Sequence, residues 1–300
     1  MRVFLALLTY FSYFFIVFMY TLKIVEYLKM PLHLRWELYP VIPEERFKYG
    51  GSYMEEPLFW EKKRRRSLLR GLLFLLKDYF VLSEYFKRKR SYWLSLYPWH
   101  VGFITIILFH ISCFFSGLLM LLGFRLSPSS SLVGSAFYYT TVSLGLLSFL
   151  TGLFGSVGIL IKRLEDADLR LYAAPMNFLT YVFTILVFSS GLYAFFLDPS
   201  LEEYRHFWEG LLSLRFVDVS RETAIHIILF SLFLIYLPFT RSIHYITRIL
   251  GFFLIRWDDR PNKRGGEIEG LLERELERKV DWAAPHVKRG VSWKENALSL

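Results

Sequence analysis

The sequence predicts an all-α integral membrane protein with five transmembrane helices. The chain has 300 residues, of which 54% are hydrophobic, and several of its apolar runs reach the length of about 18 residues that a membrane span needs. Lys and Arg are concentrated in the segments between these runs, as in cytoplasmic loops. Four histidines lie within or at the ends of two of the runs: His100, His110, His226 and His244. An ionisable side chain in hydrocarbon is costly, so each of them needs a partner or a function.

The predicted spans are residues 3–22, 99–122, 132–161, 174–197 and 223–244. The first is too long for the apolar core of a signal peptide and has no small-residue cleavage site, so we expect it to remain as an anchor. The third is rich in glycine, which lets neighbouring helices approach closely. Pro238 is expected to kink the fifth span.

The predicted organisation has four parts. They are a first transmembrane helix (1–22), a basic cytoplasmic segment (23–97), a four-helix membrane domain that carries the four histidines (98–250) and a soluble cytoplasmic tail (251–300). Within the basic segment, residues 67–86 carry apolar side chains at helical spacing but include several charges, which predicts an amphipathic helix on the membrane surface. Residues 198–222 are predicted to form a charged loop, and a short helix is expected at about 268–279.

The distribution of positive charge predicts the orientation. In a five-span arrangement, 31 of the 36 Lys and Arg residues fall on one side of the membrane, which is therefore the cytoplasmic side. The N-terminus is then outside and the C-terminus inside. The basic cluster 62–66 adjoins membrane segments and contains no nucleic-acid-binding motif, so a lipid bilayer explains the charge and no nucleic acid is expected as a partner.

The four membrane histidines form two pairs at matched depths. Two spans separate the second from the fifth, so these two run in opposite directions. His110 is then level with His226 near the outside, and His100 is level with His244 near the cytoplasm. The 18 residues from His226 to His244 make five helical turns, which places both on one face, whereas ten residues put His110 about 80° from His100.

Two stacked pairs of imidazoles predict two haem b groups. Haem b takes two axial nitrogens and a flat apolar slot, so His110 with His226 would hold the outer iron, and His100 with His244 the inner iron. Zinc is the rival metal, but it needs about four ligands at one site. Arg241 precedes His244 by three residues. It would either pair with a haem carboxylate or serve only as a positive anchor at the membrane edge.

The residues around the histidines resemble a known family. The second span is similar to that of respiratory nitrate reductase gamma subunits in Trp99-His100-Val101-Gly102, with His110 ten residues later. The fifth is similar in Leu237-Pro238-Phe239-Thr240-Arg241-Ser242-Ile243-His244, with His226 eighteen residues upstream. The flanking stretches resemble a narrower family, the DsrM/HmeC cytochrome b subunits of the Dsr (Hme) complex of sulfate- and sulfur-metabolising prokaryotes: 32–40, 49–53, 256–259 and 282–286. With these flanks, the resemblance covers nearly the whole chain.

The resemblance implies a multi-pass cytochrome of the prokaryotic cell membrane that binds two haem b groups through the four histidines. It implies menaquinol chemistry near the outer haem and electron transfer to a cytoplasmic iron–sulfur subunit related to heterodisulfide reductase. Periplasmic cytochrome c and iron–sulfur subunits and a second membrane subunit are further implied partners. The chain would then be the electron-transfer subunit of a quinol:acceptor oxidoreductase. The basic segment and the tail are rich in arginine and tryptophan, which suits a buried interface with such a partner. The tryptophans are Trp36, Trp60, Trp257 and Trp282.

The chain departs from the gamma subunits at the expected quinone site. Phe109 stands where they have a glycine before the second ligand, and a serine-rich stretch stands where they have a lysine early in the third span. The quinone residues are therefore not carried over, and Arg125, Tyr138 and Tyr139 are named only as candidates. Two alternative functions stay open: a cytochrome b subunit of a hydrogenase or formate dehydrogenase-type complex, and a non-redox membrane anchor or transporter.

Overall fold

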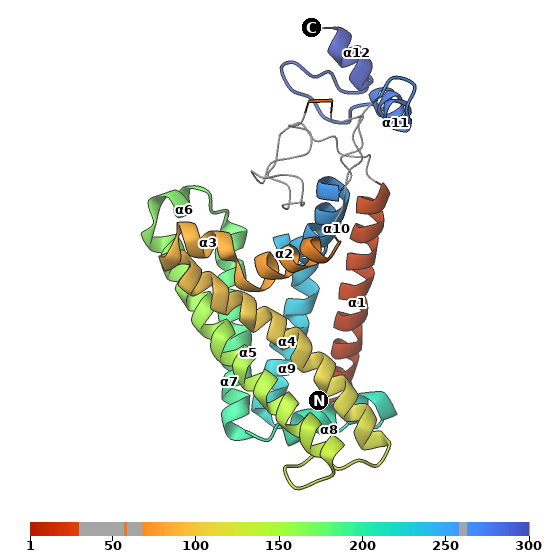
Figure 1. The fold of residues 1–300 in the computed structure, drawn as a ribbon. Coiled ribbons are helices and arrows are strands. Elements are labelled where there is room, and N and C mark those ends of the chain that lie inside the picture. The colour runs from red at the N-terminus through yellow and green to blue at the C-terminus, as the bar shows by residue number, and fades with distance from the viewer. Residues whose placement is uncertain (30–56, 59–67, 258–262, 300) are drawn as a thin grey trace. The chain divides into compact units, whose positions relative to one another are not determined.

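The computed structural model describes residues 1–29, 57–58, 68–257 and 263–299, and this part of the chain is mostly helical, with no β-strand. Five of its helices are long and apolar enough to cross a membrane (Figure 1). They are α1 (Arg2–Lys29), α4 (Arg90–Leu121), α5 (Leu132–Glu165), α7 (Pro175–Leu197) and Arg221–Phe239, which combines α9 (Arg221–Tyr236) with the 3₁₀ helix η3 (Leu237–Phe239). The all-α class is thereby confirmed for the described residues, and each predicted span corresponds to a helix that is long and apolar enough to cross a membrane.

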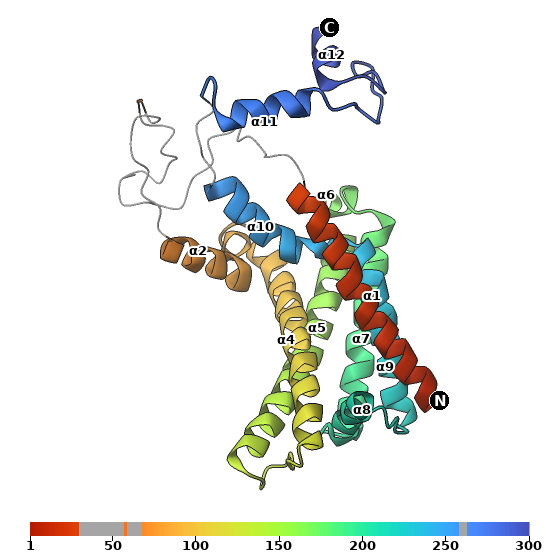
Figure 2. The ribbon, with the colours of Figure 1, turned by 90° about the vertical axis from the view of Figure 1, so that its right-hand side faces the viewer.

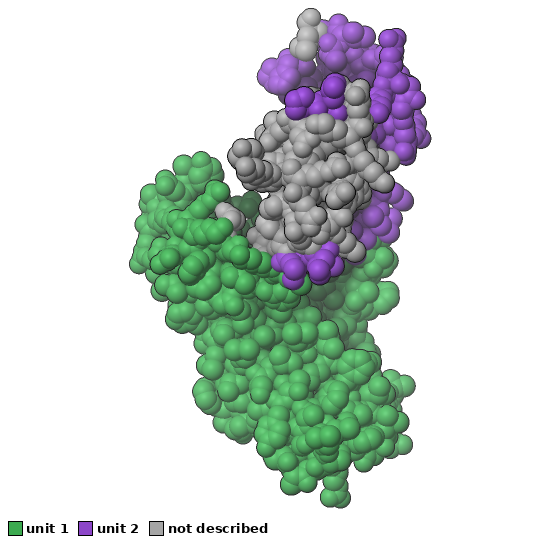
Figure 3. All heavy atoms as spheres, in the orientation of Figure 1, with its two compact units in different colours: residues 1–22, 76–243 green, residues 23–75, 244–300 purple. Residues whose placement is uncertain are grey.

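The chain divides into two compact units, which Figure 3 shows in different colours. The first contains residues 1–22 and 76–243, and the second contains 23–75 and 244–300. The first span, predicted as a separate part, packs in the first unit through Leu5 and Ala6, which are buried in the same core as residues of the other spans.

Several predicted features lie outside the described residues. They are most of the basic segment, with Trp36 and Trp60, and the flanking stretches 32–40 and 49–53. The predicted boundary at residue 98 falls inside α4, which already begins at Arg90.

Short polar residues fix where the spans begin. The side chain of Ser131 accepts a hydrogen bond from the backbone N–H of Gly134 at the start of α5, and the side chain of Ser220 does the same for Thr223 at the start of α9. Such caps satisfy backbone donors that have no partner within the helix. Helix α7 begins with Pro175, where the missing N–H costs nothing.

Helices α4 and α5 pack at very short range, and they run side by side in both views (Figures 1 and 2). A Cβ atom on Gly102 would lie 2.4 Å from the Cα of Gly152, and one on Gly155 would lie 2.2 Å from the backbone nitrogen of Trp99. Only glycine allows two backbones to come this close. The glycines of the third span therefore serve the close packing that the sequence predicted.

The fifth span ends earlier than predicted. A single kinked helix over residues 223–244 was expected, but α9 ends at Tyr236, and η3 is followed by an extended Thr240 (φ −100°, ψ −176°). A second 3₁₀ helix, η4 (Arg241–Ile243), leads into α10 (His244–Trp257). Pro238 has no N–H to continue the helical hydrogen bonding.

Hydrogen bonds of Ser242 stabilise this break. Its hydroxyl donates to the carbonyl of Leu237 over 2.6 Å, and its backbone N–H donates to Oγ1 of Thr240 over 3.1 Å. His226 and His244 therefore lie on different helices, and the argument that five whole turns place them on one face is wrong. Arg241 lies in η4 and not in the helix that His244 begins.

The segment 198–222 is not the simple loop that was predicted, because it contains α8 (Glu202–Ser213). Its buried apolar side chains recur with helical spacing: Tyr204, Phe207, Trp208 and Leu211. Helix α8 lies across the end of the first unit, close to the N-terminus of α1 (Figure 1). The hydroxyl of Tyr10 on α1 donates to the carbonyl of Leu211 over 2.5 Å, so α1 and α8 are directly joined.

The predicted amphipathic helix is present in two parts, α2 (Leu68–Val81) and α3 (Ser83–Arg88), divided at Leu82, whose φ is +51°. The 14 residues of α2 extend about 21 Å, which is shorter than the roughly 30 Å of a bilayer's hydrocarbon core. This length agrees with the prediction that 67–86 is not a span.

The tail has the helix that was predicted near 268–279, as α11 (Glu267–Leu276), and a second short helix, α12 (Trp293–Leu298). Asn296 joins α12 to the preceding turn. Its amide oxygen accepts from the N–H of Lys288 over 2.7 Å, and its amide nitrogen donates to the carbonyl of the same residue over 3.1 Å.

An ion pair at the end of the first unit opposite α8 makes stability depend on pH. The Lys89 ammonium lies 2.6 Å from the Asp166 carboxylate, which also caps α6 (Ala167–Leu171) by accepting from the N–H of Leu169. The hydrogen bond from Lys89 lowers the pKa of Asp166. Because the folded pKa lies below the unfolded value of about 4, the stabilisation is present above pH 4 and is lost as pH falls through the folded pKa.

We therefore expect Asp166→Asn to lower the melting temperature slightly at neutral pH and not at all in strong acid. Asparagine still caps the helix, so the difference reports the charge, and the effect is small because the pair is exposed. Thermal melts in detergent between pH 3 and pH 7 measure it. A difference between the two proteins that stays constant over this range would contradict the assignment.

Candidate functional site

Two of the four predicted ligand histidines meet in one buried aromatic cluster. His110 on α4 is 5% exposed, and His226 on α9 is 3% exposed. The ring of Phe230 stacks on that of His110 with centroids 4.0 Å apart and lies 6.1 Å from that of His226. The Tyr204 ring is 6.0 Å from the first imidazole and 6.4 Å from the second. The structure thus brings together the residues that were predicted as the outer pair.

Local hydrogen bonds set the tautomer of His110. Its Nδ1 lies 2.7 Å from the carbonyl oxygen of Ile106, which can only accept, so Nδ1 carries the proton and donates it. Its Nε2 is then an acceptor, and the hydroxyl of Tyr204 donates to it over 3.0 Å. Burial raises the pKa of Tyr204, which keeps this hydroxyl protonated.

His226 has the same tautomer. The hydroxyl of Ser190 on α7 donates to the carbonyl of Val187 over 2.9 Å and lies 3.1 Å from Nδ1 of His226. Since the hydroxyl proton is used on Val187, Nδ1 of His226 donates to Ser190, and its Nε2 holds a lone pair. Among the described residues this buried Nε2 has no hydrogen-bond partner.

A small cavity of about 20 Å³ adjoins His226, which is room for about one water molecule. Its walls are mostly apolar, and its polar groups come from four positions: Asp198, Tyr204, Thr223 and His226. Gly191 forms part of the wall, where an added Cβ would lie 2.4 Å from the ring of Phe149 and 2.8 Å from the imidazole of His226. The absence of a side chain at position 191 therefore makes room for both rings.

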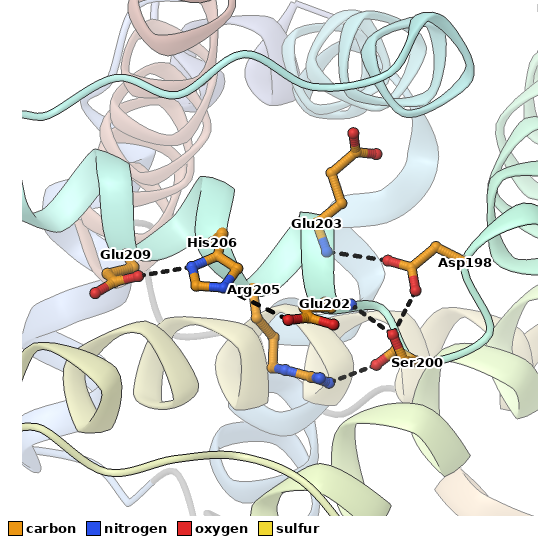
Figure 4. Close-up of polar contacts among 7 residues, drawn as sticks. All are labelled: Asp198, Ser200, Glu202, Glu203, Arg205, His206 and Glu209. Atoms are coloured by element: carbon orange, nitrogen blue, oxygen red, sulfur yellow. Dashed lines mark hydrogen bonds and ion pairs between the residues drawn. The ribbon is translucent and has the colours of Figure 1, made fainter.

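Helix α8 supplies Tyr204 to the cluster, and polar contacts at its start hold it in place (Figure 4). The carboxylate of Asp198 accepts from the backbone N–H of Glu203 over 3.0 Å, and the guanidinium of Arg205 donates to the carbonyl of Ser200 over 2.7 Å. The carboxylate of Glu203 accepts in turn from the hydroxyl of Ser220 over 2.7 Å, which ties α8 to the cap of α9.

The predicted inner pair is divided between the two units. His100 lies in the first, where its Nδ1 is 2.9 Å from the carbonyl oxygen of Leu96, so this imidazole also donates from Nδ1. His244 begins α10 in the second unit, with its ring 4.5 Å from that of Tyr245. The pairing of His100 with His244, and the role of Arg241, stay predictions.

The candidate quinone residues are not part of the cavity beside His226. Arg125 is exposed in the turn after α4, and Tyr139 is 56% exposed. Tyr138 is half-buried, and the guanidinium of Arg205 lies 5.1 Å from the centre of its ring. The structure therefore places these three residues at the α8 end of the unit but does not gather them into one site.

Some residues of the cluster were not predicted from the sequence. Tyr204 had a signal, because α8 has apolar residues at helical spacing within a stretch dominated by charges. Phe230 and Ser190 had none, since aromatic and small residues are common throughout the spans. Among the described residues there is no group of three or more His, Cys, Asp or Glu side chains able to hold a metal ion.

Comparisons with protein-family models, curated proteins and solved structures gave no match.

Proposed function

We propose that the chain is a di-haem cytochrome b, the electron-transfer subunit of a quinol-linked membrane complex. The observation that carries the proposal is the pair of buried imidazoles on two antiparallel spans, His110 and His226. Each donates from Nδ1 to a neighbouring group, as metal-ligating histidines do. The Nε2 of His226 is buried without a partner, and such atoms are rare enough in folded proteins to need an explanation. A haem iron bound between the two imidazoles would explain why this atom has no partner.

The residues present fit this group. His110 and His226 would hold the iron, while Ile106 and Ser190 fix the orientation of their rings. The ring of Phe230 packs on the His110 ring and must turn aside for a macrocycle to reach it, and the Tyr204 hydroxyl and the iron are alternative partners of the His110 Nε2. When bound, haem b supplies one-electron chemistry, with a potential that depends on its ligands and on the dryness of its pocket.

The second haem is proposed at His100 and His244. The Nδ1 of His100 lies 2.9 Å from the carbonyl oxygen of Leu96, and its Nε2 is proposed as the atom that binds the iron. Arg241 is proposed to pair with a carboxylate of this haem at the membrane edge. We further propose that the end of the first unit bearing α8 faces outside, because Lys and Arg are scarce there.

The proposed reaction and partners are those implied by the resemblance to DsrM/HmeC subunits. We propose that menaquinol gives up two electrons and two protons near the outer haem, and that the electrons reach a cytoplasmic iron–sulfur subunit related to heterodisulfide reductase. Periplasmic cytochrome c and iron–sulfur subunits and a second membrane subunit complete the proposed complex in sulfur or sulfate metabolism. Co-purification followed by identification of the bound subunits separates this assembly from a hydrogenase or formate dehydrogenase complex.

A haem count tests the proposal directly. Purified protein should show a reduced-minus-oxidised spectrum of b-type haem, and a pyridine haemochrome assay should give two haems per chain. A protein expressed with adequate haem supply that shows no Soret absorbance would instead be a non-redox membrane anchor.

A further inference from the structure

The first helix brings a buried hydroxyl without a partner into the His110 cluster. The hydroxyl of Tyr13 on α1 is buried and has no hydrogen-bond partner among the described residues. Its ring lies 6.3 Å from that of His110 and meets the ring of Trp208 on α8 edge-on at 5.5 Å. The indole Nε1 of Trp208, whose ring lies 6.4 Å from that of His110, is likewise buried without a partner among the described residues. Three buried atoms of this cluster therefore have no partner there: Oη of Tyr13, Nε1 of Trp208 and Nε2 of His226.

Tyr13 differs in this from two other tyrosines of the same helix. The hydroxyl of Tyr10 donates to the carbonyl of Leu211, and that of Tyr20 lies 2.7 Å from Oγ of Ser242. The helix thus satisfies the hydroxyls on either side of Tyr13 along the chain. Leaving a buried hydroxyl unpaired costs about 1–3 kcal/mol, and phenylalanine at position 13 would avoid that cost, so the hydroxyl points to a missing acceptor.

The unpartnered atoms have complementary requirements. The Nε2 of His226 holds a lone pair that needs an electrophile or a proton donor, whereas the hydroxyl of Tyr13 and the indole N–H of Trp208 are donors that need an acceptor. The Tyr204 hydroxyl already donates to His110, so it has no second proton to give to His226. A bound group that carries both an electrophilic metal and an anionic oxygen would supply a partner for His226 and an acceptor for the hydroxyl of Tyr13.

We propose that the Tyr13 hydroxyl donates a hydrogen bond to a carboxylate of the haem held by His110 and His226, which makes α1 part of the binding site. The inference rests on the proposed function. Such a bond is charge-assisted and therefore stronger than one between neutral groups. Because the donated hydrogen bond partly offsets the negative charge of the carboxylate, that charge would stabilise the oxidised iron less, and the midpoint potential of this haem would be higher than without the bond.

The test compares Tyr13→Phe with Tyr20→Phe in the full-length protein. Tyr20→Phe is the matched control for the haem at His110 and His226, because it removes a partly buried hydroxyl from the same helix whose partner is Ser242 and not a residue of the His110 cluster. Both variants should fold and bind two haems. Redox titration followed by optical spectroscopy should show a lower midpoint potential for one haem in Tyr13→Phe only. Haem transfer to apomyoglobin from that site should be about tenfold faster, as expected for the loss of a hydrogen bond to a charged group.

The outcomes separate the two proposals. Unchanged potentials and unchanged haem release in Tyr13→Phe, with two haems bound in the wild-type protein, would overturn the role of Tyr13 and point to a water molecule as its partner. A wild-type protein without haem would overturn the proposed function itself. Equal shifts in Tyr13→Phe and Tyr20→Phe would also contradict the inference, because they would reflect a general effect on α1.

Discussion

Replacing His110 with alanine should lower the haem content of the purified protein to about half, because one axial nitrogen cannot hold a bis-histidine haem in place. The remaining haem should keep its low-spin spectrum, since its proposed ligands are elsewhere. The same substitution removes the acceptor of the Tyr204 hydroxyl. The pyridine haemochrome assay, normalised to polypeptide, measures the loss, and electron paramagnetic resonance identifies which low-spin signal is absent.

The control for this experiment is His206→Ala. His206 is exposed on α8, and its imidazole is 2.9 Å from the carboxylate of Glu209, so it has no role in the buried cluster. Its replacement should leave the haem content unchanged. Two full bis-histidine signals in His110→Ala would show that His110 is a packing residue and not a ligand.

The second large effect is expected at the crossing of α4 and α5. In Gly102→Ala the added Cβ would lie 2.4 Å from the Cα and 2.5 Å from the backbone nitrogen of Gly152. A backbone cannot turn aside as a flexible side chain can, so the helices must separate. We expect the free energy of unfolding to fall by about 3 kcal/mol, at the upper end of the cost of overpacking. Because α4 carries His100 and His110, haem should be lost as well.

Gly270→Ala is the matched substitution at an open position. Gly270 lies within α11, and an added Cβ would meet nothing within 4 Å. Alanine in such a helix is favoured by about 0.5–1 kcal/mol over glycine. Unfolding in detergent, followed by circular dichroism, compares the two variants. Equal stability of Gly102→Ala and the wild-type protein would mean that α4 and α5 do not approach as closely as the structure shows.

The fold class could be predicted because a membrane span has a strong compositional signal. Length and hydropathy alone identify a run that crosses the bilayer, and all five predicted runs are helices that qualify. The predicted end of the fifth span was wrong because hydropathy does not detect a break in backbone hydrogen bonding. The apolar character continues past Pro238, while hydrogen bonding to Ser242 breaks the helix there. Helix α8 was missed because its charges conceal four apolar residues at helical spacing.

Of the candidate site, only the ionisable residues could be predicted from the sequence. Histidines stand out in an apolar run, and counting spans between them sufficed to place His110 beside His226. Nothing in the sequence marked Tyr13 or Ser190, because tyrosine and serine occur throughout the spans and their roles depend on which helices are neighbours. That information is long-range, and it depends on glycine contacts such as that between Gly102 and Gly152.

Haem content in single and double variants tests most directly whether His110 and His226 share one iron. The account predicts that His110→Ala, His226→Ala and the double variant all retain the same amount, about one haem per chain, because each change removes the same group. If the double variant instead lost more haem than either single variant, the two imidazoles would be serving different irons, and the shared site would be refuted.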